Sequence, residues 1–402
     1  MRPTSLAESA RGPARRSLLL VSIATVGVIS VWFTTNAVAP VLSIEFGFGE
    51  GDVAWLTIAV QLGFVAGTLL SSLLNLPERL HERRLFAIAA VLAATANLVP
   101  LGSDDLGVWL VARFMTGVFL GGVYPPAMQV IARWFQGGRG IAIGVVVGSL
   151  TLGSGSPHLL RAFLAEEWRT TLVAASALCV AAAALMILGV RDGPFHTPVR
   201  EVRLRDFWRG VSDRASLLVL GGYLGHMWEL YAMWAWLPVY LATRLSPGIA
   251  SAASFAVFVV GAVSCVVAGF VAERWGRTAV TSAAMALSGG TALVIGFVPG
   301  GAVVVIVLAL IWGSTVVADS AQFSTAMTEV ADARYRGSAL SFQTGLGFLL
   351  TALTIRAVPL VEGWAGWGAA FAFLAIGPAL GVMAMLVLRT RPEARALAGG
   401  RR

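Results

Sequence analysis

Long apolar stretches separated by short polar ones recur along the whole chain of 402 residues. A membrane-spanning helix needs about 20 consecutive, mainly apolar residues, whereas a spanning β-strand would show alternation over about 10 residues. Twelve stretches are long enough and do not alternate, so the pattern predicts an all-α integral membrane protein with twelve transmembrane helices. The expected spans are 17–43, 53–76, 85–102, 107–133, 140–163, 170–190, 215–241, 248–271, 279–297, 302–327, 338–361 and 368–388.

The composition excludes a water-soluble enzyme. Hydrophobic residues make up 57% of the chain and charged residues 12%, whereas soluble domains carry about a quarter charged residues. The net charge of +8 would suggest nucleic-acid binding in a soluble protein, but every basic residue here is an arginine and most lie in short loops. We therefore expect the lipid bilayer, and no nucleic acid, as the surroundings of this chain.

The arginines also predict the orientation. Most of the 29 basic residues fall on one side of the membrane if the N-terminus is cytoplasmic, and positive loops mark the cytoplasmic side. Both termini are then cytoplasmic. The apolar run from Ser17 to Leu42 exceeds the 7–15 residues, roughly, of a signal-peptide core, so we interpret it as the first span. Arginine-only basic usage is typical of a GC-rich bacterial genome, which indicates a bacterial inner membrane.

Two halves of the chain repeat each other. We expect an N-terminal six-helix half over residues 1–190, a polar cytoplasmic linker over 191–214 and a C-terminal six-helix half over 215–402. Parallel repeats of this kind are one way in which transporters are built. The matching positions are Glu78 and Glu273, 195 apart, Arg139 and Arg336, 197 apart, and Trp168 and Trp367, 199 apart.

The loop after the eighth span carries a recognisable motif, Gly269-Phe-Val-Ala-Glu273-Arg274-Trp-Gly276-Arg277. It resembles the loop signature of the major facilitator superfamily, G-x-x-A-[D/E]-R-x-G-R. The fourth span carries Arg113 followed by a face of small residues, which is similar to the family's second signature. The resemblance implies the fold of that superfamily and the function of a secondary transporter.

The first-half copy of this loop is degraded: His81 replaces the glycine and Glu82 replaces an arginine. A carboxylate at the inner end of a span can face the positive N-terminus of a helix from the other half. The resemblance makes the fifth span the partner of Glu273 and the eleventh span the partner of Glu78, so that the contacts latch the cytoplasmic side. The expected latch residues are Glu78, Arg79, Glu273, Arg274, Gly276 and Arg277.

Ionisable residues inside spans are costly and are therefore candidates for function. His226 and Glu229 lie near the middle of the seventh span, and their i, i+3 spacing places them on one face of the helix. Asp319 lies in a polar run of the tenth span, Val317-Ala-Asp319-Ser-Ala-Gln-Phe-Ser-Thr. Because histidine titrates near neutral pH, we expect these three residues to bind protons or substrate. A polar pair that only fixes helix packing is the alternative.

Basic residues in the outer halves of spans are the candidate anion ligands. Arg113 lies about 9 Å from the outer end of its span, at 1.5 Å per residue, and can snorkel outward in part. His158 and Arg356 fall at nearly related repeat positions, so the two halves can present basic groups across a cavity. For Arg161, at the end of the fifth span, we expect snorkelling.

These observations predict a transporter, not an enzyme, that moves a small solute by alternating access around a midplane site. The leading substrate is a small anion with proton coupling, and the chain resembles the cyanate-permease-like branch somewhat more than the nitrate porters. The alternative is proton-antiport efflux of amphiphilic drugs or metabolites; a membrane sensor and a membrane enzyme fit less well. We expect a functional monomer with no cofactor and no metal, because there is no GxxxxGK[ST], HExxH or CxxC motif.

Overall fold

The computed structural model describes residues 11–74, 76–135, 139–164, 167–195, 207–332 and 334–401. Ten helical stretches among them are long and apolar enough to cross a membrane. The last, Arg336–Arg389, has 54 residues, or about 80 Å of helix, against about 30 Å of bilayer core. Gly366 interrupts it with φ 78°, so it crosses twice. The 31-residue α12 (Arg214–Arg244) accounts for one further span. The described residues therefore contain the twelve spans that the sequence predicts.

The helices keep the order of the expected spans. They are α2 (Arg11–Ile29), α3 (Thr34–Phe46), α4 (Glu50–Leu73), α5 (Leu76–Arg79), α6 (Glu82–Leu98), η1 (Val99–Gly102), α7 (Leu106–Leu120), α8 (Tyr124–Ala132), α9 (Arg139–Phe163), α10 (Trp168–Gly189), α11 (Phe207–Val211), α12 (Arg214–Arg244), α13 (Pro247–Trp275), α14 (Arg277–Ile295), α15 (Ala302–Ala318), α16 (Ser320–Val330), α17 (Arg336–Leu374), α18 (Ile376–Arg389) and η3 (Pro392–Gly400).

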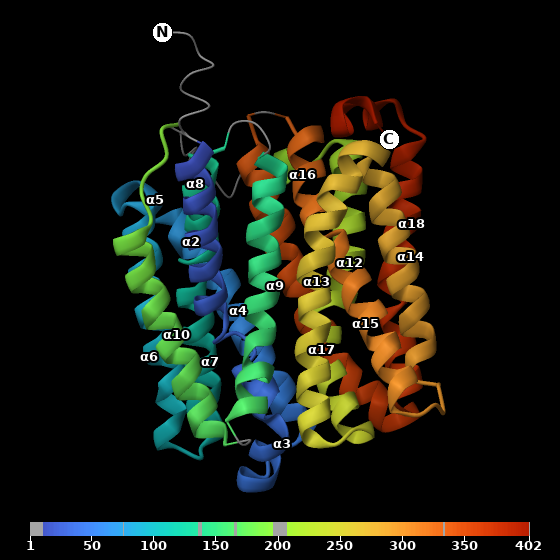
Figure 1. Cartoon of the computed structure of the whole chain (residues 1–402). Helices are drawn as coiled ribbons and strands as arrows, with labels where there is room; N and C mark the ends of the chain where they lie inside the picture. The colour runs from blue at the N-terminus through green and yellow to red at the C-terminus, as the bar shows by residue number, and fades with distance from the viewer. Residues whose placement is uncertain are drawn as a thin grey trace.

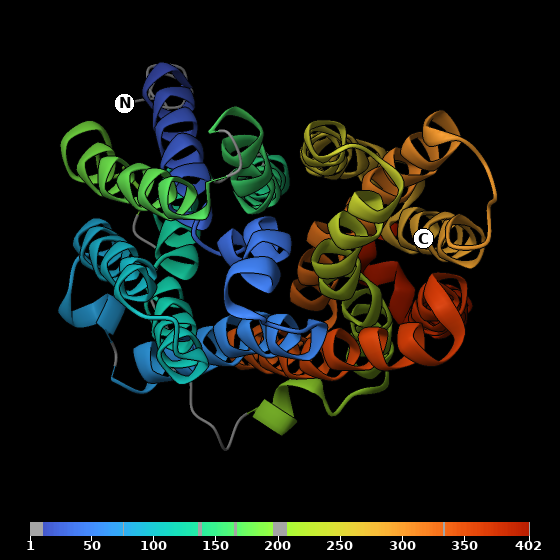
Figure 2. The ribbon, with the colours of Figure 1, turned by 90° about the horizontal axis from the view of Figure 1, so that it is seen from below.

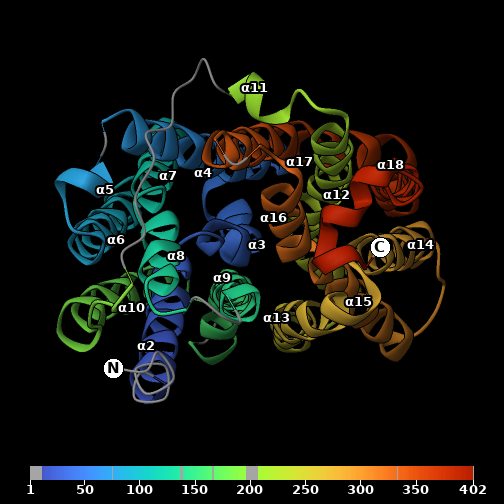
Figure 3. The same cartoon turned by 90° about the horizontal axis from the view of Figure 1, so that it is seen from above.

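Helices α2 to α10 form one half of the bundle and α12 to α18 the other, side by side (Figures 1 and 3). The halves meet mainly along two helix pairs, α9 with α13 and α4 with α17, which Figure 2 shows from the opposite side. Helix α2 begins and α18 ends at the same end of the bundle (Figure 1). We call this the N/C end and the opposite one, where α3 lies, the far end.

Four of the spans are broken helices. The first is interrupted between α2 and α3 at residues 30–33, the fourth between α7 and α8 at residues 121–123, the tenth between α15 and α16 at Asp319, and the twelfth between α17 and α18 at Ala375. The breaks in the fourth and tenth spans fall at the same repeat position. A break leaves backbone groups without partners inside the helix, and buried side chains must satisfy them. Such discontinuities therefore place polar side chains in the middle of the bundle.

Small residues allow the helices of the first half to touch. A Cβ atom on Gly117 of α7 would lie 2.1 Å from the carbonyl oxygen of Val60 on α4. On α9, by contrast, a Cβ on Gly144 would lie 4.0 Å from its nearest neighbour, the carbonyl oxygen of Cys265. The expected role of glycine in helix packing therefore holds strongly at Gly117 and weakly at Gly144.

Candidate functional site

Arg113 holds the break in the first span. Its side chain is 1% exposed and donates from Nη1 to the carbonyl oxygen of Val31 at 2.8 Å, and from Nη2 to the carbonyl oxygen of Trp32. Nη1 also lies 3.3 Å from both Thr34 Oγ1 and Asn97 Oδ1. The guanidinium thus satisfies carbonyls of the break between α2 and α3. The partial outward snorkelling that the sequence allows for Arg113 does not occur, because these acceptors lie inside the bundle.

Two ionisable side chains meet in the middle of the second half, and a third lies one turn further along α12. Nδ1 of His226 lies 2.9 Å from Oδ1 of Asp319, and both side chains are 1% exposed. Glu229, one turn further along α12, accepts hydrogen bonds from Ser288 Oγ at 2.8 Å and from Trp312 Nε1 at 2.7 Å. His226 and Glu229 therefore share a face of α12, as expected, but each has its own partners. We call His226, Glu229 and Asp319 the buried acid cluster.

The loop motif forms an ion network at the N/C end. Arg277 donates to both carboxylate oxygens of Glu329 at 2.7 Å, to Gln322 Oε1 at 2.8 Å and to Glu273 Oε1 at 3.0 Å. In these contacts Glu273 binds within its own half, and no described hydrogen bond joins it to α9. Arg274, its neighbour, is exposed. The expected latch from Glu273 to the fifth span stays a prediction.

The first half has the same ion pair with its charges reversed. Arg133 Nη2 donates to Glu82 Oε1, and Glu82 is 2% exposed. Glu82 stands 195 positions before Arg277, and Arg133 stands 196 before Glu329. The carboxylate and the guanidinium have therefore exchanged places between the halves, which explains why Glu82 occupies an arginine position of the motif.

Backbone geometry explains why His81 can replace the motif glycine in the first-half loop. Gly276 has φ 92° and ψ 151°, a conformation that side chains with a Cβ rarely adopt. His81, at the same repeat position, has φ −55° and ψ 138°, which any residue adopts. The first loop therefore needs no glycine. Arg79 is exposed, and the side chain of Glu78 lies outside the described residues.

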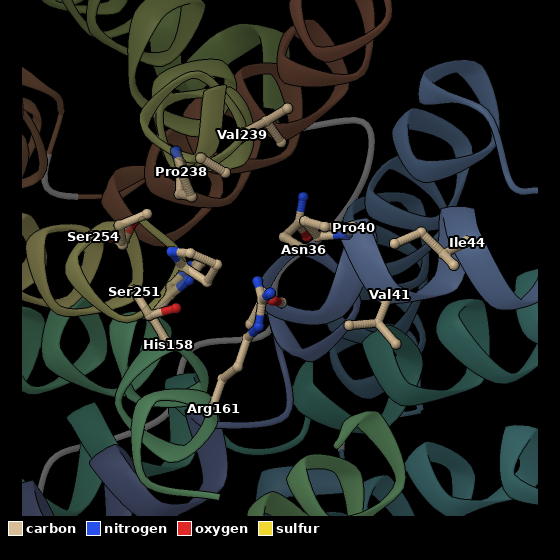
Figure 4. Close-up of a pocket in the computed structure, with 14 residues that line it drawn as sticks. Asn36, Pro40, Val41, Ile44, His158, Arg161, Pro238, Val239, Ser251 and Ser254 are labelled. Atoms are coloured by element: carbon tan, nitrogen blue, oxygen red, sulfur yellow. Dashed lines mark hydrogen bonds between the residues drawn. The ribbon is translucent and has the colours of Figure 1, made fainter. Parts of the chain in front are cut away.

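A cavity of about 220 Å³ lies at the far end between the halves. Helix α9 contributes His158 and Arg161, and Asn36 comes from α3 (Figure 4). The guanidinium of Arg161 reaches from α9 toward α3 (Figure 4), where its Nη1 donates to the carbonyl oxygen of Ala37 at 2.7 Å. None of the described residues that line the cavity is acidic. The lining residues are Asn36, Ala37, Pro40, Val41, Ile44, His158, Arg161, Pro238, Val239, Ala242, Pro247, Ala250, Ser251 and Ser254.

The structure agrees with the predicted positions of some basic residues and contradicts that of another. Arg161 is 8% exposed, so the prediction that it snorkels to the surface is wrong: its guanidinium donates to the carbonyl oxygen of Ala37, a buried residue of α3. Its i, i+3 spacing from His158 places both on one face of α9, a signal that could have identified it. Arg356 is half-buried on α17 and does not line the cavity. Asn36, which does line it, has no signal in the sequence that we can name.

Comparisons with known proteins agree on the fold. Over 180 residues the chain is 27% identical to the putative uncharacterized transporter YgaY of Escherichia coli, covering 44% of each chain. It is 28% identical over 170 residues to the puromycin resistance protein pur8 of Streptomyces alboniger, covering 40% of this chain and 33% of that protein. The chain thus matches less than half the length of either relative.

Solved structures resemble the whole bundle. The nucleoside transporter NupG matches with a TM-score of 0.71 at 13% identity, covering 92% of this chain and 99% of that one. The human organic anion transporter MFSD10 matches with a TM-score of 0.69 at 16% identity, covering 93% and 99%. At these identities the likeness shows the fold alone. The sequence model described as Major Facilitator Superfamily matches residues 21–355, and the chain therefore belongs to the Major Facilitator Superfamily of membrane transporters.

Proposed function

We propose that this transporter moves a small anion by alternating access, and that its far-end cavity admits the solute. The cavity carries the proposal: Arg161 and His158 line it, and none of its described lining residues is acidic. A guanidinium and an imidazole in the lining of a cavity offer hydrogen-bond donors that suit an anion better than a cation. Rocking of one half against the other would then carry the solute through the bundle.

The size of the cavity argues against the alternative, efflux of amphiphilic drugs. Pockets for drug-sized ligands measure about 300–1,000 Å³, whereas this one measures about 220 Å³. Cationic amphiphiles would also need a carboxylate, and Glu229 is already bound to Ser288 and Trp312. The name of the puromycin resistance protein supports efflux, but only 40% of this chain aligns with it.

The buried acid cluster is our candidate for proton coupling. His226 and Asp319 lie 2.9 Å apart with 1% exposure, so any change in their protonation changes the charge of a desolvated site. Charge changes are energetically large in such surroundings. Asp319 also marks the break between α15 and α16, where a helix bends most easily. Protonation would thereby alter the position of α16 relative to α15.

Topology and surroundings follow from the charges of the loops. The common end of α2 and α18 (Figure 1) supports both termini on one side, and the loop arginines favour the cytoplasm for that side. A bacterial inner membrane, a functional monomer and the cyanate-permease-like branch stay predictions from sequence. The latch of Glu78, Arg79, Glu273, Arg274, Gly276 and Arg277 is proposed to close this cytoplasmic side.

Flux measurements test the anion proposal. Purified protein is placed in liposomes that contain a pH-sensitive dye, and nitrate, sulfate, methanesulfonate, benzenesulfonate or an amphiphilic cation is added. These anions stay ionised at neutral pH and cross protein-free bilayers slowly. We expect acidification with at least one anion and about tenfold weaker uptake in Arg161→Gln, since hydrogen bonds to charged groups contribute about 1.5–3 kcal/mol. Arg244→Gln, an exposed arginine outside the cavity, should behave as wild type.

Coupling is tested separately with Asp319→Asn. This variant should still exchange labelled anion for unlabelled anion across the bilayer but should move no protons. Wild-type acidification by Asp319→Asn would refute coupling through this residue. Flux of the cation alone, or anion uptake unchanged in Arg161→Gln, would refute the anion proposal and favour efflux.

A further inference from the structure

A recess of about 340 Å³ lies at the N/C end of the first half, where α6 begins and α10 ends. His81, Arg83, Arg84 and Ile187 line it, and none of these described lining residues is acidic. Figure 3 shows α6 and α10 at the outer edge of the first half, away from the second half. This α6–α10 recess therefore faces the lipid and not the solute path between the halves.

The two arginines of the recess leave hydrogen-bond donors free in different ways. Arg83 is fixed, because its Nε and Nη2 donate to the two carboxylate oxygens of Asp192 at 3.1 Å and its Nη1 donates to the carbonyl oxygen of Val190 at 2.6 Å. A guanidinium has five N–H donors, so two remain on Arg83. The side chain of Arg84 is exposed and forms no hydrogen bond or ion pair with any residue that the structure describes. All five of its donors remain.

The described charges around the recess leave one cation without a counter-ion. Asp192 offsets Arg83, and the same carboxylate lies 3.2 Å from Nε2 of His81. Glu82, whose Oε2 lies 3.7 Å from Nδ1 of His81, already has a guanidinium partner. Arg84 therefore supplies the net positive charge of the recess. Arginine binds carboxylate or phosphate oxygens in pairs, and the carboxylates nearby are taken, so a phosphate suits this position.

Apolar side chains continue from the recess along both helices. On α6 the exposed Ile88 and Val91 follow Arg84 by four and seven positions, so all three share one face of the helix. On α10, which packs against α6, the exposed Val180 precedes Ile187 by seven positions. The two helices thus present cations at the end of a span and an apolar surface toward the middle of the bilayer. This sequence of surfaces matches the headgroup and acyl chains of one phospholipid.

We infer that the α6–α10 recess binds an anionic phospholipid, with the phosphate between Arg83 and Arg84 and the acyl chains along α6 and α10. Basic pockets between transmembrane helices bind anionic headgroups in this way. A choline headgroup would bring a quaternary ammonium beside two guanidinium groups, so phosphatidylcholine should bind more weakly. The inference goes beyond solute transport and does not depend on it, because the recess lies outside the solute path.

Native mass spectrometry of the detergent-solubilised full chain tests the inference. The delipidated protein is titrated separately with phosphatidylglycerol and with phosphatidylcholine of the same acyl chains, and bound lipids are counted by mass. We expect one phosphatidylglycerol to bind at least about fivefold more tightly than phosphatidylcholine. This factor corresponds to about 1 kcal/mol for one basic residue beside an anionic headgroup, at 1.4 kcal/mol per factor of ten. Glycerol phosphate, which has the phosphate but no acyl chains, should not displace the lipid at the same concentration.

Variants separate the recess from general surface charge. Arg84→Gln should weaken phosphatidylglycerol about fivefold and leave phosphatidylcholine unchanged. Arg84→Lys should fall between wild type and Arg84→Gln, because an ammonium group lacks the bidentate fork. Ile187→Glu keeps both arginines but places a carboxylate in the recess, and it should weaken phosphatidylglycerol at least as much. Arg389→Gln is the matched control and should bind as wild type, since Arg389 is an exposed arginine at the end of α18 that does not line the recess.

Three results would overturn the inference, each for a different reason. Equal losses in Arg84→Gln and Arg389→Gln would show that surface charge in general, and not the recess, attracts the lipid. Equal affinity for phosphatidylglycerol and phosphatidylcholine would show that the headgroup charge is not recognised. Displacement of the lipid by an equal concentration of glycerol phosphate would assign the recess to a soluble phosphate compound.

Discussion

The reversed ion pairs at the N/C end lead to a double-swap prediction. Glu82 and Arg133 form in the first half the contact that Arg277 and Glu329 form in the second, with opposite polarity. If the geometry tolerates either polarity, exchanging the charges in the first half should be accepted. We therefore predict that Glu82→Arg and Arg133→Glu each destabilise the protein and that together they largely restore its stability.

The magnitude follows from burial. Glu82 is 2% exposed and Arg133 is 18% exposed. Removing one partner of a fully buried pair costs about 3–5 kcal/mol, and the partial exposure of Arg133 reduces this to about 2–3 kcal/mol. Each single swap adds repulsion between like charges. The double variant regains the attraction and should lie within about 1 kcal/mol of wild type, apart from the new contact with His81, whose Nδ1 is 3.7 Å from Glu82 Oε2.

Two buried cysteines provide an assay for each half. Cys179 in the first half and Cys265 in the second are free and 0% exposed, so a thiol-reactive dye labels each only when its half opens. In a Cys265→Ala background the dye reports on Cys179 alone. We expect each single swap to lower the labelling temperature by about 4–12 °C, at about 2–4 °C per kcal/mol for a unit of this size, and the double swap to recover most of it.

The matching charge exchange in the second half should give a different result. Arg277 also donates to Gln322 and Glu273, so its exchange with Glu329 would place a carboxylate at position 277, directly beside that of Glu273. The swap in the second half should therefore not be rescued. If the first-half double swap is no more stable than the worse single swap, Glu82 and Arg133 are not energetically coupled and the reasoning fails.

Two further predictions concern the breaks and the packing. Arg113→Lys should lower the thermal stability by several degrees, because an ammonium group cannot reach the separated carbonyls that the planar guanidinium spans; stability equal to wild type would show that water or other groups cap α2. Gly117→Ala should reduce the yield of folded protein, since its Cβ would lie 2.1 Å from the Val60 oxygen. Gly144→Ala should be tolerated, because its Cβ would lie 4.0 Å from its nearest neighbour, an ordinary van der Waals contact. Size-exclusion profiles after detergent extraction measure both glycine variants, and equal profiles would contradict the packing argument.

The spans were predictable because the bilayer imposes their length. Each crossing needs about 20 apolar residues whatever its neighbours are, so apolar runs alone locate α4, α9 or α13 correctly. The positions of the breaks were not predictable. The first span stops being helical at residues 30–33 without proline or glycine there, because Arg113, some 80 positions later, binds the exposed carbonyls. Such a contact is visible only in three dimensions.

Site residues were harder to predict because spans lack an amphipathic period. A helix surrounded by lipid and by other apolar helices is apolar on nearly every side, so its rotation cannot be inferred from the pattern. The sequence therefore placed His226 and Glu229 on one face but could not show that Asp319 lies 2.9 Å from His226. For the same reason Arg161 was assigned to the surface, although the structure buries it beside Ala37.

The two halves share a repeat but carry opposite chemistry. Away from the ion pairs of the N/C end, the first half holds the buried arginines, with Arg113 and Arg161 both bound to carbonyls of the broken first span. The second half holds the buried carboxylates Glu229 and Asp319, and Asp319 stands where the first half has the glycines of its own break. A solute and a proton that bind to different halves can be coupled only by the motion of one half relative to the other. This separation favours indirect coupling through α12 and α16 over direct competition of proton and anion for one group.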